Sequence, residues 1–120
     1  MKPVALALVL TLAGGASASA QVITPDIDRT LWCASAFYWL AASAEDSGST
    51  EEAETYDGWS RRLLDLAGPG LIAAGFTSEK IEDIVVQYDD KVLTQLSTDE
   101  TPSYDVVTCP ELVAGLAKPG

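Results

Sequence analysis

Apolar residues recur every three or four positions along three stretches of this chain, which predicts three amphipathic helices. The predicted ranges are 26–44, 50–67 and 78–96, with a polar turn between the first two and an apolar connector, residues 71–76, before the third. No stretch alternates apolar and polar residues as a half-buried strand does. The pattern therefore predicts an all-α fold, a small bundle of three main helices plus a short C-terminal helical element that contains Leu112, Val113 and Leu116.

The first predicted helix is apolar on almost every side. Thr24 and Pro25 are typical of a helix start, with Thr as the cap and Pro at the first helical position. One stripe at helical spacing is formed by Ile27, Leu31, Ala34, Tyr38 and Ala41, and a second group outside it by Trp32, Cys33, Phe37, Trp39 and Leu40. A helix that is apolar all round is buried, and this one is too short to span a membrane. We therefore expect it at the centre of the bundle.

Capping residues and helix breakers predict the ends of the other two helices. Ser49 and Glu52 form a capping-box pattern at the start of the second helix. Gly68-Pro69-Gly70 predicts its end, because Gly favours a C-terminal cap and Pro removes a backbone donor. Thr77 or Ser78 is expected to cap the third helix. The apolar stripes of these helices are Ala53, Tyr56, Leu63 and Ala67, and then Ile81, Val85, Tyr88 and Val92.

Cys33 and Cys109 are the only two cysteines of the chain. An even count without Cys-x-x-Cys spacing, in an exported chain, favours one structural disulfide over free redox thiols or a soft-metal pair. Such a bond would tie the first helix to the C-terminal segment and stabilise the domain by up to about 4.5 kcal/mol through the entropy of the unfolded chain. Because Cys109 precedes Pro110, we expect it at a cap or bend.

The first twenty residues have the three parts of a secretory signal peptide. Lys2 gives a positive start, residues 4–13 form an uncharged apolar run, and small residues precede a cleavage site after Ala20. The apolar run is too short to anchor the protein in a bilayer. The sequence thus predicts that residues 1–20 are removed and that residues 21–120 form one helical domain in the periplasm or outside the cell.

The charge balance and the lack of histidine exclude several classes of function. Lys2 is the one charged residue of the leader, so the mature chain keeps 18 acidic residues against six basic ones, a formal net charge of −12. Nucleic acid and anionic lipid would repel it, and a partner steered by charge would be basic. Without histidine the chain lacks the commonest general base and the commonest zinc ligand. We therefore expect no catalytic residue, metal or cofactor.

Trp32 and Trp39 are the candidate partner-binding residues. They lie seven positions apart and so project from nearly the same side of the first helix. Tryptophan is enriched at interaction hot spots, which favours a binding surface. The alternative is that the other helices and the C-terminal segment bury both side chains, since the disulfide would hold that segment beside this helix.

These observations together predict a small secreted or periplasmic binding or accessory protein without enzymatic activity, whose partner is another envelope protein. The plan of a leader, about a hundred residues and one long-range disulfide resembles that of small helical two-cysteine periplasmic proteins, acid-stress chaperones among them. A periplasmic stress chaperone and an immunity protein against a secreted toxin are therefore alternatives. A small enzyme that depends on carboxylates is a second alternative. The mature chain has no predicted membrane span.

Overall fold

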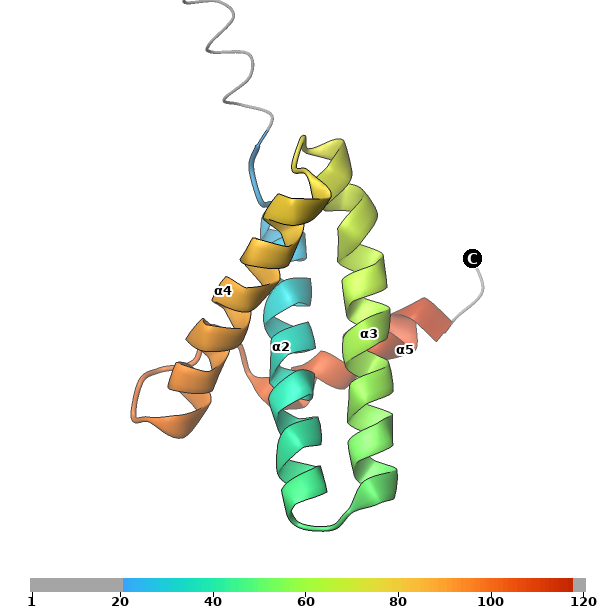
Figure 1. The fold of residues 1–120 in the computed structure, drawn as a ribbon, viewed down its shortest axis with the longest axis vertical. Helices are drawn as coiled ribbons and strands as arrows, with labels where there is room; N and C mark the ends of the chain where they lie inside the picture. Colours follow the sequence, from blue (N-terminus) through green and yellow to red (C-terminus); the bar gives the residue numbers. More distant parts are fainter. Residues whose placement is uncertain (1–20, 118–120) are drawn as a thin grey trace, which may run out of the picture.

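The computed structural model describes residues 21–117, and this part of the protein is helical (Figure 1). Three long helices, α2 (Pro25–Asp46), α3 (Thr50–Ala73) and α4 (Ser78–Ser97), precede a 3-10 turn, η1 (Val106–Thr108), and the short helix α5 (Cys109–Ala117). No strand occurs in residues 21–117. The predicted all-α fold with three main helices and a short C-terminal helix is confirmed. The predicted leader, residues 1–20, and residues 118–120 lie outside the described part.

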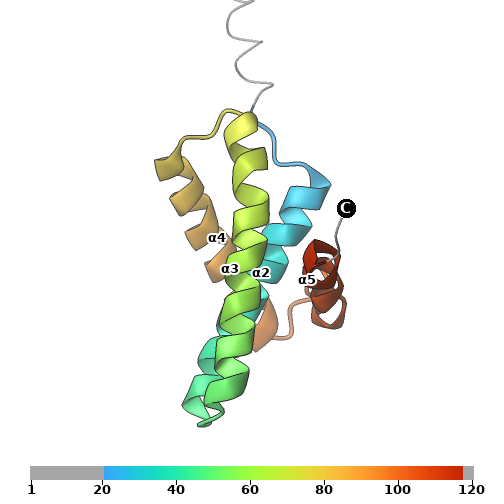
Figure 2. The ribbon, with the colours of Figure 1, turned by 90° about the vertical axis from the view of Figure 1, so that its right-hand side faces the viewer.

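The helix α2 lies at the centre of the bundle. It runs antiparallel to α3, while α4 and α5 lie on opposite sides of this pair (Figure 2). Every residue of α2 from Thr30 to Phe37 is buried, because α3, α4 and α5 cover it from different directions. This arrangement explains why the middle of α2 is apolar around its whole circumference.

Both ends of α2 form as the local sequence dictates. The Thr24 hydroxyl accepts a hydrogen bond from the Ile27 amide at 3.3 Å, and Pro25 is the first helical residue. At the other end Gly48 adopts a φ of 82°, a left-handed conformation that glycine accepts without strain. The Ser49 amide then donates to the Ala44 carbonyl at 2.8 Å, which completes a Schellman turn.

The predicted capping box at the start of α3 is wrong. Ser49 does occupy the cap position, but its side chain accepts no backbone hydrogen bond. Its ψ of 73° differs from the extended values of the working caps, 161° at Thr24 and 164° at Thr77. The physical reason is the short connection: Ser49 also belongs to the turn that ends α2, so its backbone cannot take the capping conformation. At α4 the cap is Thr77, whose hydroxyl accepts the Lys80 amide at 3.1 Å.

The predicted end of α3 at Gly68-Pro69-Gly70 is also wrong, because the helix continues to Ala73 with Pro69 inside it. Its end is a second Schellman turn around Gly75, which has a φ of 98°. There the Phe76 amide donates to the Leu71 carbonyl at 3.1 Å. The local sequence thus favours a helix end at Gly68-Pro69-Gly70, whereas tertiary packing extends α3 by about one turn, to Ala73.

Burial of Leu71 and the close approach of α2 explain this extension. Leu71 is 1 % exposed and packs in a core cluster with Leu31, Ala67 and Ile84. Burying such a side chain contributes about 1.5–3 kcal/mol, which offsets part of the poor helix propensity of this segment. A Cβ atom on Gly70 would lie 2.9 Å from the Ile27 Cδ1 atom. Gly70 therefore lets two helices approach rather than ending one.

The disulfide between Cys33 and Cys109 joins α2 to α5, and both residues are wholly buried. It lies in the larger core cluster, which also contains Trp32, Phe37, Leu63, Val92 and Val113. The predicted pairing is confirmed. Cys109 does lie at a cap, the C-cap of η1, but its φ of −64° and ψ of −37° are helical, contrary to the bias expected before Pro110. As Cys109 is the first residue of α5, Pro110 falls in the first turn, where its missing amide hydrogen has no intrahelical partner to lose.

Candidate functional site

Trp32, one of the two predicted binding residues, lies entirely in the core. Its relative exposure is 0 %, and its ring meets that of Tyr104 edge to face with the centroids 5.7 Å apart. The indole nitrogen donates a hydrogen bond to Gln95 Oε1 at 2.8 Å. Because no part of the side chain is exposed, Trp32 links α2 to α4 and offers no surface to a partner in this conformation.

Trp39, the second predicted binding residue, is half-buried against α4. Its indole nitrogen donates to the backbone carbonyl of Asp89 at 2.9 Å, and its ring contacts Tyr38 with the centroids 4.9 Å apart. Both tryptophans therefore hydrogen-bond to α4. The tryptophan pair singled out in the sequence therefore forms an intramolecular contact between α2 and α4.

Asp28 on α2 is the centre of a second contact, which we call the Asp28 clamp. It joins α2 to Tyr88 of α4 and to Tyr104 of the segment before η1. Its carboxylate accepts hydrogen bonds from the hydroxyls of Tyr88, at 2.5 Å, and Tyr104, at 2.6 Å. Burial and the bond to Asp28 raise the pKa of Tyr88. The bond to Asp28, with burial, raises the pKa of Tyr104 to about 12. Both phenols therefore stay protonated and donate to Asp28 at neutral pH.

Asp89 on α4 is a carboxyl with a shifted pKa. The Ser35 hydroxyl donates to its Oδ1 atom at 2.6 Å. Burial raises the pKa of Asp89 and the neighbouring Asp90 adds to this, whereas the bond from Ser35 acts in the opposite direction. A raised carboxyl pKa is one mark of a general acid, but Asp89 is held in the contact between two helices. We assign it a structural role.

The Asp28 clamp and the Ser35–Asp89 pair were not predicted from the sequence, which placed Tyr88 in the apolar stripe of its helix. A signal was present, because Asp28, Trp32, Ser35 and Trp39 follow one another at helical spacing on the side of α2 that meets α4. Polar groups that recur on one face of a largely apolar helix indicate a hydrogen-bonded seam.

An uncovered apolar hollow of about 440 Å³ lies between α3 and α4, and we call it the upper hollow. The buried side chains of Leu31 and Leu71 form part of its lining, and Val86, at its edge, is 57 % exposed. The remaining lining residues are Leu64, Ala67, Gly68, Ile81, Glu82 and Val85. The two helices pack on α2 more than on each other, which leaves this space open.

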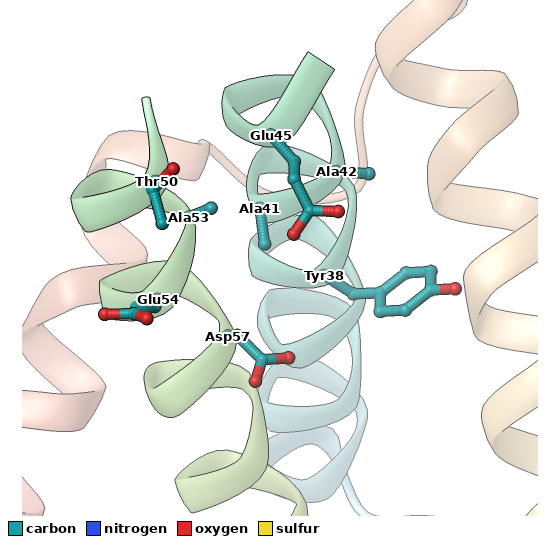
Figure 3. Close-up of a pocket in the computed structure, with 8 residues that line it drawn as sticks. All are labelled: Tyr38, Ala41, Ala42, Glu45, Thr50, Ala53, Glu54 and Asp57. Carbon is teal, nitrogen blue, oxygen red and sulfur yellow. The ribbon is translucent and has the colours of Figure 1, made fainter. Parts of the chain in front are cut away.

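A second hollow of about 330 Å³, the lower hollow, lies between α2 and α3 near the turn that joins them (Figure 3). Asp57 extends from α3 toward α2, the Glu45 side chain overlies its own helix, and Glu54 points away from both. The Tyr38 ring, 47 % exposed, extends from α2 toward α4. Arg61 forms an ion pair with Asp57. The remaining lining residues are Ala41, Ala42, Thr50 and Ala53, so small side chains form the floor between acidic ones.

The two hollows lie on one face of the molecule, which we call the front groove. On α2, Leu31 lines the upper hollow and Tyr38 and Glu45 line the lower one, each seven positions from the next. On α3, Leu64 of the upper hollow and Asp57 of the lower one have the same spacing. Residues at this spacing project from nearly the same side of a helix. From Thr50 to Leu71 the groove runs about 32 Å. Residues of α4 line its upper hollow, and α4 and α5 lie on opposite sides of the α2–α3 pair (Figure 2).

No protein-family model matches the sequence, and comparisons with curated proteins and with solved structures find no match. Within residues 21–117, no three Cys, Asp or Glu side chains lie together as metal ligands would. No helix of that same part combines the length and the apolar character that crossing a bilayer requires. The front groove is therefore the surface feature from which a function can be inferred.

Proposed function

We propose that this protein is exported and acts without catalysis, as a binding or accessory protein of the cell envelope or its surroundings. The observation that carries this proposal is the front groove. Its upper hollow exposes apolar surface on Val86 beside the buried Leu31 and Leu71. Apolar hollows rimmed by polar residues on small proteins mark interaction surfaces.

Export is supported by two independent features. Residues 1–20 have the charge, apolar run and small residues of a cleavable leader. The buried Cys33–Cys109 bond also favours an oxidising compartment, where such bonds form and persist.

A binding role is preferred to catalysis because the groups with shifted pKa values are used in packing. Tyr88 and Tyr104 donate to Asp28, and Asp89 accepts from Ser35, so each is engaged between helices. Asp89, the carboxyl whose pKa is raised, lines neither hollow. A carboxylate enzyme needs such a group facing its substrate.

The experiment is fractionation followed by capture. The full chain, with a C-terminal tag, is expressed in its host, and the processed form is crosslinked and pulled down from the extracytoplasmic fraction. We expect a chain that begins at Gln21, carries an intact disulfide and captures another exported protein. Retention in the cytoplasm with both thiols reduced would overturn the proposal. So would turnover of a substrate that single Asp or Glu changes abolish in folded protein.

The captured material also separates the two binding alternatives. One folded protein bound in a fixed ratio favours an immunity protein. A set of unfolded proteins favours a chaperone.

A further inference from the structure

We infer that the front groove binds an amphipathic basic helix of another exported protein. The apolar face of that helix would fill the upper hollow, and its Lys or Arg side chains would lie over the lower hollow. This inference rests on the proposed binding function and specifies the chemistry of the partner.

The shape of the upper hollow suits a helix. It lies between two helices, α3 and α4, and its lining includes Leu64, Leu71, Ile81 and Val85 from the two walls with Leu31 beneath. A helix laid there would pack against both walls and against α2, as the fourth member of a bundle. Grooves of this kind take a helix through apolar residues at positions i, i+3 or i+4, and i+7.

The chemistry of the lower hollow specifies the charge of that helix. Glu45 and Asp57 line the lower hollow, and Glu82 lines the upper hollow. Arg61, the cation beside them, is already paired with Asp57. A guest helix with basic residues along its flanks therefore meets carboxylates at both ends of the groove, and the net charge of the mature chain would speed its approach.

The same charges argue against two other occupants. A second copy would bring another chain of the same formal charge, −12 after removal of the leader, against an acidic groove. The leader of this chain is apolar but carries Lys2 as its one charge, so it lacks the cations that the lower hollow calls for.

The test uses the purified, disulfide-bonded protein and a labelled synthetic helix of about 20 residues, long enough to span the groove. Leu occupies positions i, i+3, i+4 and i+7 of each repeat in this peptide, and Lys most of the others. One control peptide replaces every Lys with Glu, and another has the same composition in an order that forms no apolar face. Fluorescence anisotropy gives the dissociation constants at low and high salt.

Two pairs of variants locate the binding. Gly68 lines the upper hollow, and nothing lies within 4 Å of a Cβ atom built on it, so Gly68→Leu has room to start a side chain that extends into the hollow. Gly58→Leu on the same helix is the matched control, because its site is equally open and lines neither hollow. Glu45→Gln removes a charge from the lower hollow, and Glu111→Gln removes one from α5 on the far side.

Of the three peptides, we expect only the Lys peptide with the apolar face to bind. Gly68→Leu should raise its dissociation constant about tenfold or more and Glu45→Gln about threefold, with a weaker salt dependence, whereas both controls stay within about twofold. Equal binding of the Lys and Glu peptides, or binding of neither, would overturn the inference. Equal effects of Glu45→Gln and Glu111→Gln without an effect of Gly68→Leu would indicate attraction by net charge alone and also overturn it. A dimer in sedimentation that Gly68→Leu dissociates would assign the groove to a second copy instead.

The capture experiment distinguishes this inference from the proposed function. If Gly68→Leu protein still captures its partner, the binding function stands and the groove is not the site. If the wild-type protein captures nothing and binds no peptide, both are wrong.

Discussion

Single side chains in this protein fasten helices to one another through hydrogen bonds that few sequence rules anticipate. Trp32 reaches Gln95, Trp39 reaches the Asp89 backbone, and Asp28 accepts two phenols. A tryptophan pair in the uncharged stretch 30–44 of this helix is compatible with either a core or an interface, and the sequence could not decide between them. The decision depends on where α4 lies, which is a property of the whole bundle.

Replacement of Trp32 by Ala should be among the most damaging changes in the chain. The side chain is wholly buried, so we expect a loss of about 3–5 kcal/mol in the free energy of unfolding, measured with urea. Trp39→Ala should cost less, because its side chain is half-buried. Equal small losses at both positions would contradict the assignment of Trp32 to the core.

The Asp28 clamp predicts a loss of stability at alkaline pH. The folded-state pKa values of Tyr88 and Tyr104 lie above their ordinary value of 10.0. The folded protein therefore holds these protons more tightly than the unfolded chain does. This contribution to stability is complete below pH 10 and is lost as the pH rises through about 12. Unfolding free energies across this range should fall steeply in the wild type and less steeply in Tyr88→Phe/Tyr104→Phe, and parallel curves would refute the clamp.

The raised pKa of Asp89 should lower the free energy of unfolding near neutral pH. Its pKa is raised in the folded protein, so its ionised form is less favourable there than in the unfolded chain. Asp89→Asn keeps an acceptor for Ser35 and removes the charge, so the variant should be at least as stable as the wild type at pH 7. Any gain should vanish below the pKa of the unfolded carboxyl, where both states are protonated. Urea titrations at neutral and acidic pH measure this, with Asp83→Asn on the exposed side of α4 as the control.

At the scale of elements, the sequence predicted where helices form better than where they end. The boundaries of α2 and α4 follow local caps, Thr24 and Thr77, and both were predicted to within two residues. The end of α3 was not, because burial of Leu71 outweighs the local preference of Gly68-Pro69-Gly70. The front groove was also beyond prediction, since it depends on how α3 and α4 diverge across α2.

Two glycines of α3, Gly58 and Gly70, should differ in how much stability the protein gains when each is replaced by alanine. Gly58→Ala should stabilise the protein by about 0.5–1 kcal/mol, because alanine favours the helix and the new Cβ atom meets open space. Gly70→Ala should gain less, since its Cβ atom would lie 2.9 Å from Ile27 Cδ1 and that side chain must move. Thermal unfolding of both variants tests this, and an equal gain at the two sites would show that α2 and α3 are not in close contact at Gly70.

At the scale of the whole molecule, one covalent bond holds the C-terminal helix in place. α5 is short, and the bond from Cys109 to Cys33 anchors it on the side of the α2–α3 pair opposite α4. The remaining contacts of α5 with the larger core cluster involve few apolar side chains, Leu112 and Val113 among them.

Removal of the disulfide should therefore weaken the protein markedly and release α5 first. Cys33→Ala/Cys109→Ala should lose up to about 4.5 kcal/mol of unfolding free energy, the figure for a closed loop of this length. Hydrogen exchange should show protection lost in α5 before α2 and α3. Uniform loss of protection in all four helices would contradict this order.

The same bond can form only after almost the whole chain has been made. Cys109 follows Cys33 by 76 residues, so a growing or translocating chain presents the thiol of α2 long before its partner thiol emerges. During that interval α5 does not yet cover α2, and the Cys33 thiol has no intramolecular partner. Formation of the bond therefore completes the fold, covers this side of α2 and removes the free thiol.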